Sequence, residues 1–168
     1  MPQQPAQFPL IDGFKFAAAG GRAHGTWPVS AFPRLRDLLL DDSGMIEYEV
    51  RGSVNAHGQP QLALRASGTL RLTCRRCLDA LEFAPRVDAT LLLASTQAEV
   101  DAEPMTAEGL DSIVATKEMS LRDLVEDELL LALPDAPRHE DCAARAELAP
   151  RAGQTPFAGL RSKLRGDR

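Results

Sequence analysis

The sequence predicts an α+β fold, in which an antiparallel β-meander or partly closed sheet packs with two short helices and is followed by a basic C-terminal tail helix. Apolar and polar residues alternate over residues 45–55, 61–73 and 81–94. This period of two is typical of half-buried strands. The chain has 168 residues, of which 44% are hydrophobic, and this length and composition fit one packed domain.

The segment 61–73 shows the alternation most clearly. Its even positions are mostly apolar and its odd positions mostly polar, which predicts that they lie on opposite faces of one strand. The residues expected to be buried are Leu62, Leu64, Leu70 and Leu72, and those expected to be exposed are Arg65 and Arg71. Shorter strands are predicted at residues 14–16 and 26–29.

Two segments have the 3.6-residue periodicity of a helix. The first covers residues 30–40, with Ser30 as its cap and one apolar face formed by Phe32, Leu35, Leu38 and Leu39. The second begins at Ser120 and ends before Pro134. Its predicted apolar face holds Leu121, Leu124, Val125 and Leu129, and its predicted solvent face holds Arg122, Asp123, Glu126 and Asp127.

We expect a single domain over residues 13–142, an N-terminal arm over residues 1–12 and a basic tail over residues 143–168. Within the domain, residues 95–111 contain five acidic and no basic residues, which predicts an acidic loop. Three cysteines, an odd number, argue against a disulfide framework. Because no apolar run reaches the ~18–20 residues of a membrane helix and the start lacks a secretory signal pattern, we expect a cytoplasmic protein.

The net charge of −5 is unevenly distributed. Residues 1–142 carry 13 basic and 22 acidic side chains, whereas residues 143–168 carry six basic and two acidic ones. The tail contains a predicted short helix with Phe157, Leu160 and Leu164 as apolar positions and Arg161, Lys163 and Arg165 as basic ones. So short a helix is marginal alone, so we expect it to contact a polyanion or to dock on its own body.

The clearest candidate site combines Cys74-x₂-Cys77 with His139-x₂-Cys142. Four thiolate or imidazole ligands are what a tetrahedral zinc ion takes, and each x₂ spacing lets a tight turn direct two ligands at one ion. The sequence therefore predicts a Cys₃His zinc site. A Cys-x₂-Cys redox pair, a catalytic Cys142–His139 couple and three free thiols are the alternatives.

Arginines flank this hairpin of cysteines at positions 65, 71, 75, 76 and 86. Guanidinium groups pair well with phosphate oxygens, although solvated arginines that balance nearby carboxylates are the alternative. The candidate RNA-binding residues are Arg65, Arg71, Arg75, Arg76, Arg161, Lys163 and Arg165. P-loop, dinucleotide-binding, zinc-protease and nucleophile-elbow motifs are all absent, so the sequence indicates no enzyme class.

Several segments together resemble one bacterial family. Gly68-Thr-Leu leads into Cys74-Arg-Arg-Cys-Leu, a helix ends in Leu-Leu-Leu-Ala-Leu-Pro134 before His139 and Cys142, and Pro156-Phe-Ala lies in the tail. In this order they resemble the YceD family of large ribosomal RNA subunit accumulation proteins. Arg75 stands where the family often has Gln, and Thr155 stands where it often has Asn.

The resemblance implies a non-enzymatic role in the synthesis, processing or stability of 23S rRNA. Its implied partners are 23S rRNA or a particle preceding the large subunit, contacted directly or through a ribosomal protein, with no membrane involved. It supplies no catalytic residue. Two alternatives remain open from the residues alone: a thiol-redox or metal-responsive protein that uses Cys74, Cys77 and Cys142, and an adaptor whose acidic body binds a basic ribosomal protein.

Overall fold

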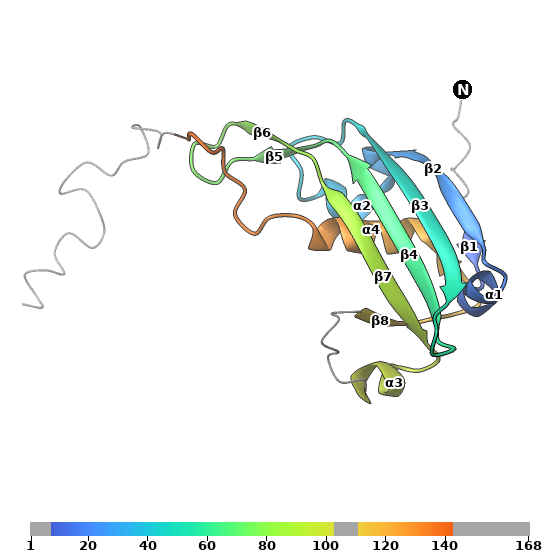
Figure 1. Cartoon of the computed structure of the whole chain (residues 1–168). Coiled ribbons are helices and arrows are strands. Elements are labelled where there is room, and N and C mark those ends of the chain that lie inside the picture. Colours follow the sequence, from blue (N-terminus) through green and yellow to red (C-terminus); the bar gives the residue numbers. More distant parts are fainter. Residues whose placement is uncertain (1–7, 103–110, 143–168) are drawn as a thin grey trace, which may run out of the picture.

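The computed structural model describes residues 8–102 and 111–142, and its framework is a five-stranded sheet with the strand order β2-β3-β4-β7-β8 (Figure 1). The strands are Arg22–Pro28, Met45–Val54, Pro60–Gly68, Arg86–Ala94 and Asp111–Val114. Neighbours are antiparallel from β2 to β7, which confirms the predicted antiparallel pairing. The edge strand β8 instead pairs parallel to β7, so the sheet is mixed, and the predicted partial closure is not confirmed.

The alternation along β3 and β4 gives this sheet one apolar face. Ile46 and Val50 on β3 and Leu62 and Leu64 on β4 are fully buried. The register places Val50 opposite Leu64, so that these side chains share one face. Two helices, α2 (Pro33–Arg36) and α4 (Leu121–Leu131), lie behind the sheet in Figure 1 and pack on this face.

The second predicted helix is confirmed as α4. The Ser120 hydroxyl accepts a hydrogen bond from the Asp123 backbone N–H at 3.2 Å, which caps its first turn. The residues predicted for its apolar face, Leu121, Leu124, Val125 and Leu129, are all buried. No helix among the described residues is long and apolar enough to span a membrane.

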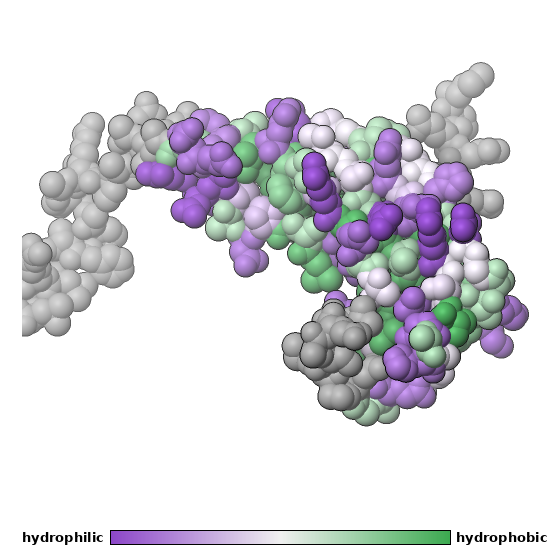
Figure 2. Space-filling model, viewed as in Figure 1, coloured by the Kyte–Doolittle hydropathy of each residue, from purple (hydrophilic) through white to green (hydrophobic). Residues whose placement is uncertain are grey.

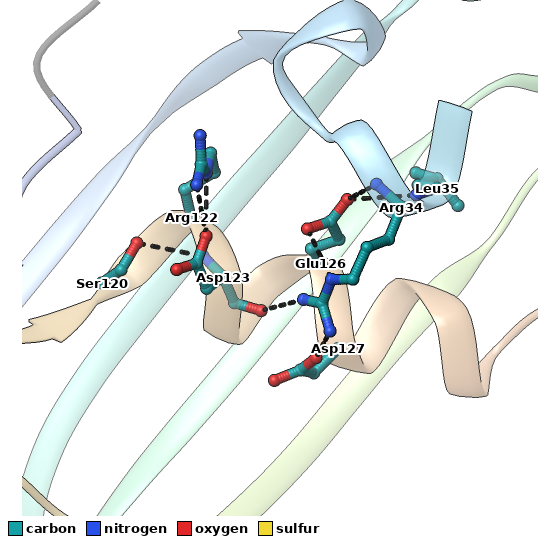
Figure 3. A network of polar contacts seen from close by, with 7 residues as sticks. All are labelled: Arg34, Leu35, Ser120, Arg122, Asp123, Glu126 and Asp127. Atoms are coloured by element: carbon teal, nitrogen blue, oxygen red, sulfur yellow. Dashed lines mark hydrogen bonds and ion pairs between the residues drawn. The ribbon is translucent and has the colours of Figure 1, made fainter. Parts of the chain in front are cut away.

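The placement of Glu126 on the solvent face of α4 is wrong, because this side chain is only 1% exposed. Figure 3 shows it directed towards Arg34 and Leu35. Its carboxylate accepts hydrogen bonds from the backbone N–H groups of Arg34 and Leu35 at 2.7 and 3.0 Å and from Arg34 Nε at 3.1 Å. The cap residue of α2 is Phe32, which has no acceptor in its side chain. Glu126 therefore satisfies the first-turn N–H groups of α2 from another helix.

The helix predicted at residues 30–40 is shorter in the structure. A 3₁₀ turn, Val29–Ala31, precedes α2, which starts at Pro33 rather than after Ser30. Phe32 and Leu35 are buried as predicted, but Leu38 is 59% exposed. The helix ends at Arg36, and the backbone N–H of Leu40 then donates to the carbonyl of Arg71 at 2.7 Å, so the chain joins a neighbouring strand.

The N-terminal region also differs from the prediction. Residues 14–16 are not a strand but belong to helix α1 (Gly13–Ala18), whose first turn is capped by the Asp12 carboxylate accepting from the Lys15 N–H at 3.1 Å. Leu10–Ile11, assigned above to an arm, form strand β1 and pair with β9, Met119–Ser120. A Cβ at Gly52 would lie 2.5 Å from the Phe16 carbonyl oxygen, so glycine lets α1 approach β3 this closely.

The acidic segment 95–111 is not wholly a loop. Residues Gln97–Ala102 form helix α3, and Asp111 already begins β8. The Glu99 carboxylate accepts a hydrogen bond from the Ser95 backbone N–H at 2.7 Å, which joins the first turn of this helix to the residue that precedes it by two positions. Residues 103–110 lie outside the described part of the chain.

The long strands predicted at 61–73 and 81–94 are each divided in two. The C-terminal part of the first forms β5 (Leu70–Thr73), and the N-terminal part of the second forms β6 (Ala80–Phe83). These two strands pair as a separate antiparallel hairpin, which extends beyond the main sheet in Figure 1. Pro85 has no N–H to donate to a ladder, which explains the break between β6 and β7. The predicted phase nevertheless holds, because Leu70 and Leu72 are buried and Arg71 is exposed.

Candidate metal centre

The turn between β5 and β6 places two cysteines close together. The Leu78 N–H donates to the carbonyl of Cys74 at 3.0 Å, and the Cys74 N–H donates to the carbonyl of Asp79 at 2.9 Å. Leu78 closes this turn in the left-handed region, with φ of 66°. Cys74 and Cys77 are both buried inside the turn. We call β5, this turn and β6 the cysteine hairpin.

The segment after α4 supplies the other two candidate ligands. We call residues 134–142 the C-terminal strap; it runs from the end of α4 to the tip of the cysteine hairpin (Figure 1). The Arg75 N–H donates to the carbonyl of Pro137 at 2.8 Å, which fixes the strap to the turn. His139 and Cys142 then lie beside Cys74 and Cys77.

The structure brings all four candidate ligands together. Their donor atoms lie within 4.8 Å of one another. The Sγ atoms of Cys74 and Cys142 are 3.6 Å apart, and Cys77 Sγ is 3.5 Å from His139 Nδ1. Tetrahedral coordination with bonds of ~2.3 Å to sulfur and ~2.0–2.1 Å to nitrogen has edges of about 3.8 Å (S–S) and about 3.6 Å (S–N). The donor set and its spacing are therefore compatible with a zinc ion.

A carbonyl outside the ligand set orients the imidazole. His139 Nε2 lies 2.9 Å from the Ala80 carbonyl oxygen. Because a carbonyl can only accept, Nε2 carries the hydrogen, and in the neutral ring the lone pair is then on Nδ1, which faces the sulfurs. Second partners of this kind are usual for histidines that bind metals.

The protein environment shifts the acidity of these groups in opposite directions. The backbone N–H of Cys77, followed by those of Arg76 and His139, lowers the pKa of the Cys74 thiol to about 5. Burial, followed by the neighbouring sulfurs, raises the pKa of Cys142 to about 11. The hydrogen bond to the Ala80 carbonyl raises the pKa of His139. A metal ion replaces protons on ligands such as these.

The alternatives from the sequence can be compared with this geometry. A sulfur–sulfur distance of 3.6 Å is far from the ~2.05 Å of a disulfide, and the three cysteines are free thiols in the structure. The Cys-x₂-Cys turn joins two strands, whereas the redox alternative requires a helix N-terminus that lowers the thiol pKa. The arrangement is compatible with a cluster of metal ligands.

The candidate RNA-binding arginines fall into two groups. Arg75 and Arg76 lie between the two cysteine ligands, are exposed, and form no ion pair with any residue that the structure describes. Arg71 is paired with Asp41 at 2.6 Å. Arg65 lies on β4, where it is paired with Asp88 at 3.3 Å. Arg161, Lys163 and Arg165 lie outside the described residues.

Arg65 belongs to a different surface from the hairpin arginines. The face of the five-stranded sheet opposite α2 and α4 is covered largely by hydrophilic side chains (Figure 2). The register places His24, Glu49, Arg65 and Asp88 in one row across β2, β3, β4 and β7. Charges of alternating sign therefore neighbour one another on this face, so it is not a basic patch.

The sequence did not reveal the groups that support the cluster. The carbonyls of Ala80 and Pro137 hold His139 and the turn in place, and a backbone carbonyl has no signature in a sequence. Pro137 follows the helix and precedes the ligands in the sequence, but its partner Arg75 is 62 positions away by residue number. Asp41, the partner of Arg71, likewise lies in an unrelated loop.

Comparison with known proteins agrees with the resemblance found in the sequence. Residues 62–156 match the family model described as large ribosomal RNA subunit accumulation protein YceD. This stretch is more than half of the chain and contains all four candidate ligands. Neither the curated proteins nor the solved structures gave a match. By the extent of the family match, the chain belongs to the YceD family, whose name assigns it to the accumulation of the large ribosomal subunit RNA.

Proposed function

We propose that this protein is a non-enzymatic cytoplasmic factor that supports the accumulation of 23S rRNA, and that it contacts the rRNA or a precursor of the large subunit with the cysteine hairpin held by zinc. The family match supports the first half of this proposal. The geometry of Cys74, Cys77, His139 and Cys142 supports the second. When bound, zinc would fix the strap to the hairpin; it would carry out no reaction.

One observation carries the proposal for the contact surface: two exposed arginines that form no ion pair with a described residue lie between two ligands of the cluster. Arg75 and Arg76 are exposed at the tip of the hairpin. Cys142 is the last ligand, so the chain enters its basic segment, residues 143–168, directly from the cluster. A zinc-held tip thus places two fixed arginines beside the start of a segment with six basic residues. Phosphate contacts of this type give affinity without base specificity.

Depletion of the protein tests the function. We expect the ratio of 23S to 16S rRNA to fall and to be restored by the wild-type gene. Cys74→Ser, which removes a ligand, should restore it poorly, whereas Ser30→Ala, a substitution at an exposed residue outside the cluster, should restore it fully. An unchanged ratio after depletion would contradict the function.

Direct RNA contact needs a separate measurement. If phosphates are bound, log affinity for a 23S rRNA fragment falls linearly with log salt concentration. No binding of RNA, together with binding of a basic ribosomal protein, would instead support the adaptor alternative, which the excess of acidic residues over residues 1–142 favours.

A metal-responsive role is the second candidate, and it is favoured because three of the four candidate ligands are thiols, which can lose a metal or be oxidised. In that case, zinc loss or oxidation of the thiols would change the 23S to 16S ratio in cells that contain normal amounts of the protein. A constant ratio under zinc limitation and under peroxide would argue against this role.

A further inference from the structure

A groove lies next to the cluster, between strand β6 and the C-terminal strap. It has a volume of about 750 Å³. Its apolar lining is formed by Leu81, Phe83, Pro134, Ala136 and Pro137. Leu81 and Phe83 are half-buried, so apolar surface is open to a further side chain at the bottom of the groove.

The rim of this groove is acidic. The lining contains the exposed acidic residues Glu82, Glu140 and Asp141, and its basic residues are the exposed Arg138 and the half-buried candidate ligand His139. None of the three carboxylates forms an ion pair with a residue in the described ranges. An apolar floor with an unbalanced acidic rim is complementary to a segment that combines apolar and basic side chains.

The chain itself contains one such segment, and it starts close to the groove. The strap ends at Cys142, directly after the rim residue Asp141. Residues 155–166 follow after a connection of twelve residues, and their sequence has Phe157, Leu160 and Leu164 as apolar positions among basic ones. Twelve extended residues reach up to ~40 Å, so the connection allows the segment to return to the groove.

We propose that this groove is the docking site of the chain's own residues 155–166, with Phe157 on the apolar floor and the basic side chains against Glu82, Glu140 and Asp141. So short a helix is marginal in water, and the groove supplies the surface that stabilises it. The docking itself does not depend on the RNA function. If that function holds, then RNA and the groove compete for the same basic residues.

Carbodiimide cross-linking of the full-length protein, followed by peptide mass spectrometry, tests the docking. This reagent joins amines to carboxylates in direct contact, and Lys163 is the only lysine after residue 117. We expect Lys163 to be linked to Glu82, Glu140 or Asp141 within one chain, with a yield that does not depend on protein concentration. The Lys15–Asp12 ion pair, at 3.3 Å, provides an internal positive control.

Matched variants make the result specific. Phe157→Ala should reduce the Lys163 cross-link at least about fivefold, because the apolar anchor is lost. Glu82→Gln with Glu140→Gln should reduce it similarly through lost charge. Glu47→Gln with Glu118→Gln removes the same charge from exposed positions outside the groove and should leave the yield unchanged.

Three results would overturn the docking proposal: no Lys163 cross-link while the Lys15 control forms, a link mainly to carboxylates elsewhere such as Glu99 or Asp101, or a link only between two chains. Addition of a 23S rRNA fragment separates the two proposals. If RNA abolishes the cross-link, the competition is supported. If the cross-link persists in saturating RNA, the docking stands and the RNA contact of the tail is contradicted.

Discussion

In the five-stranded sheet, Ile46, Leu62 and Leu64 are fully buried and pack with α4 in one apolar core. The tip of the cysteine hairpin, in contrast, has a small cluster of three buried cysteines with Leu81 packed against them. Each aliphatic side chain in the sheet contributes ~1.5–3 kcal/mol by burial. A cluster of three thiols contributes much less in this way. The sheet can therefore hold its shape by packing alone, while the shape of the hairpin tip depends on what its ligands bind.

Removal of zinc should have the largest effect, and this effect should be local. If free zinc is about 1,000 times its Kd, binding contributes about 4.1 kcal/mol to the stability of the cysteine hairpin and strap. Chelation should then speed amide hydrogen exchange there by about 10³-fold, with little change in β3 and β4. Hydrogen exchange with mass spectrometry measures both regions in one experiment.

Cys77→Ser in the presence of zinc is the matched variant and should resemble the chelated protein. Faster exchange throughout the chain would show that the sheet also depends on the metal, and unchanged exchange in the hairpin would show that its tip needs none. Either result would break the contrast between the two regions.

The next largest effect should come from Glu126, the one buried charge of the sheet region among the described residues. Glu126→Ala leaves the first-turn N–H groups of α2 without an acceptor and the Arg34 guanidinium without its buried carboxylate partner. Breaking hydrogen bonds to a charged, buried group costs about 3 kcal/mol. Urea unfolding should show this loss for the whole sheet, whereas zinc affinity should not change.

Asp127→Asn is the control, because Asp127 also pairs with Arg34, at 2.6 Å, but is about half exposed. Its loss should cost less than about 1 kcal/mol. Equal costs for Glu126→Ala and Asp127→Asn would show that the capping of α2 by Glu126 contributes little.

The features that could be predicted from the sequence are those set by residues close together in the chain. The burial of Leu62, Leu64, Leu70 and Leu72 follows from a local period of two, and the capping of α4 by Ser120 from one local motif, so both were predicted correctly. The candidate ligands were identifiable because two short spacings used every cysteine in the chain. These signals depend on residues close together in sequence.

Several other features that depend on distant contacts were not predicted. Glu126 has the periodicity of a solvent position, yet it is buried by a hydrogen bond to a residue 92 positions away. The division of β4 from β5 was likewise invisible in the alternating pattern, which continues through Gly68 and Thr69. Residues 14–16 formed a helix because Asp12 caps it and Gly52 admits it against β3. For Glu126, the distant partner and not the local pattern decides.

Charge reversal at the hairpin tip should change RNA binding with little effect on stability. Arg75→Glu with Arg76→Glu removes two phosphate contacts, so the slope of log affinity against log salt should become shallower by about 1.4–1.8. Because both side chains are exposed, the free energy of unfolding should change by less than about 0.5 kcal/mol. Fluorescence titration of a 23S rRNA fragment at several salt concentrations measures the slope.

Arg22→Glu with Lys117→Glu, two exposed residues outside the hairpin, makes the same change in net charge. A slope that falls equally in both variants would show that net charge and not the hairpin tip determines RNA binding.

The smallest effect should come from Leu78, which closes the cysteine turn in the left-handed region and is 51% exposed. That conformation costs a residue with a Cβ about 1 kcal/mol, and glycine avoids this cost but loses a similar amount of entropy on folding. Leu78→Gly should therefore change zinc affinity by less than about threefold. Leu78→Val should weaken it by about fivefold or more, because a β-branched side chain tolerates positive φ poorly. Competition with a chromophoric chelator measures both variants. If valine binds zinc as tightly as leucine, the turn does not keep its left-handed residue in the zinc-bound state, and the hairpin tip is less rigid than its hydrogen bonds indicate.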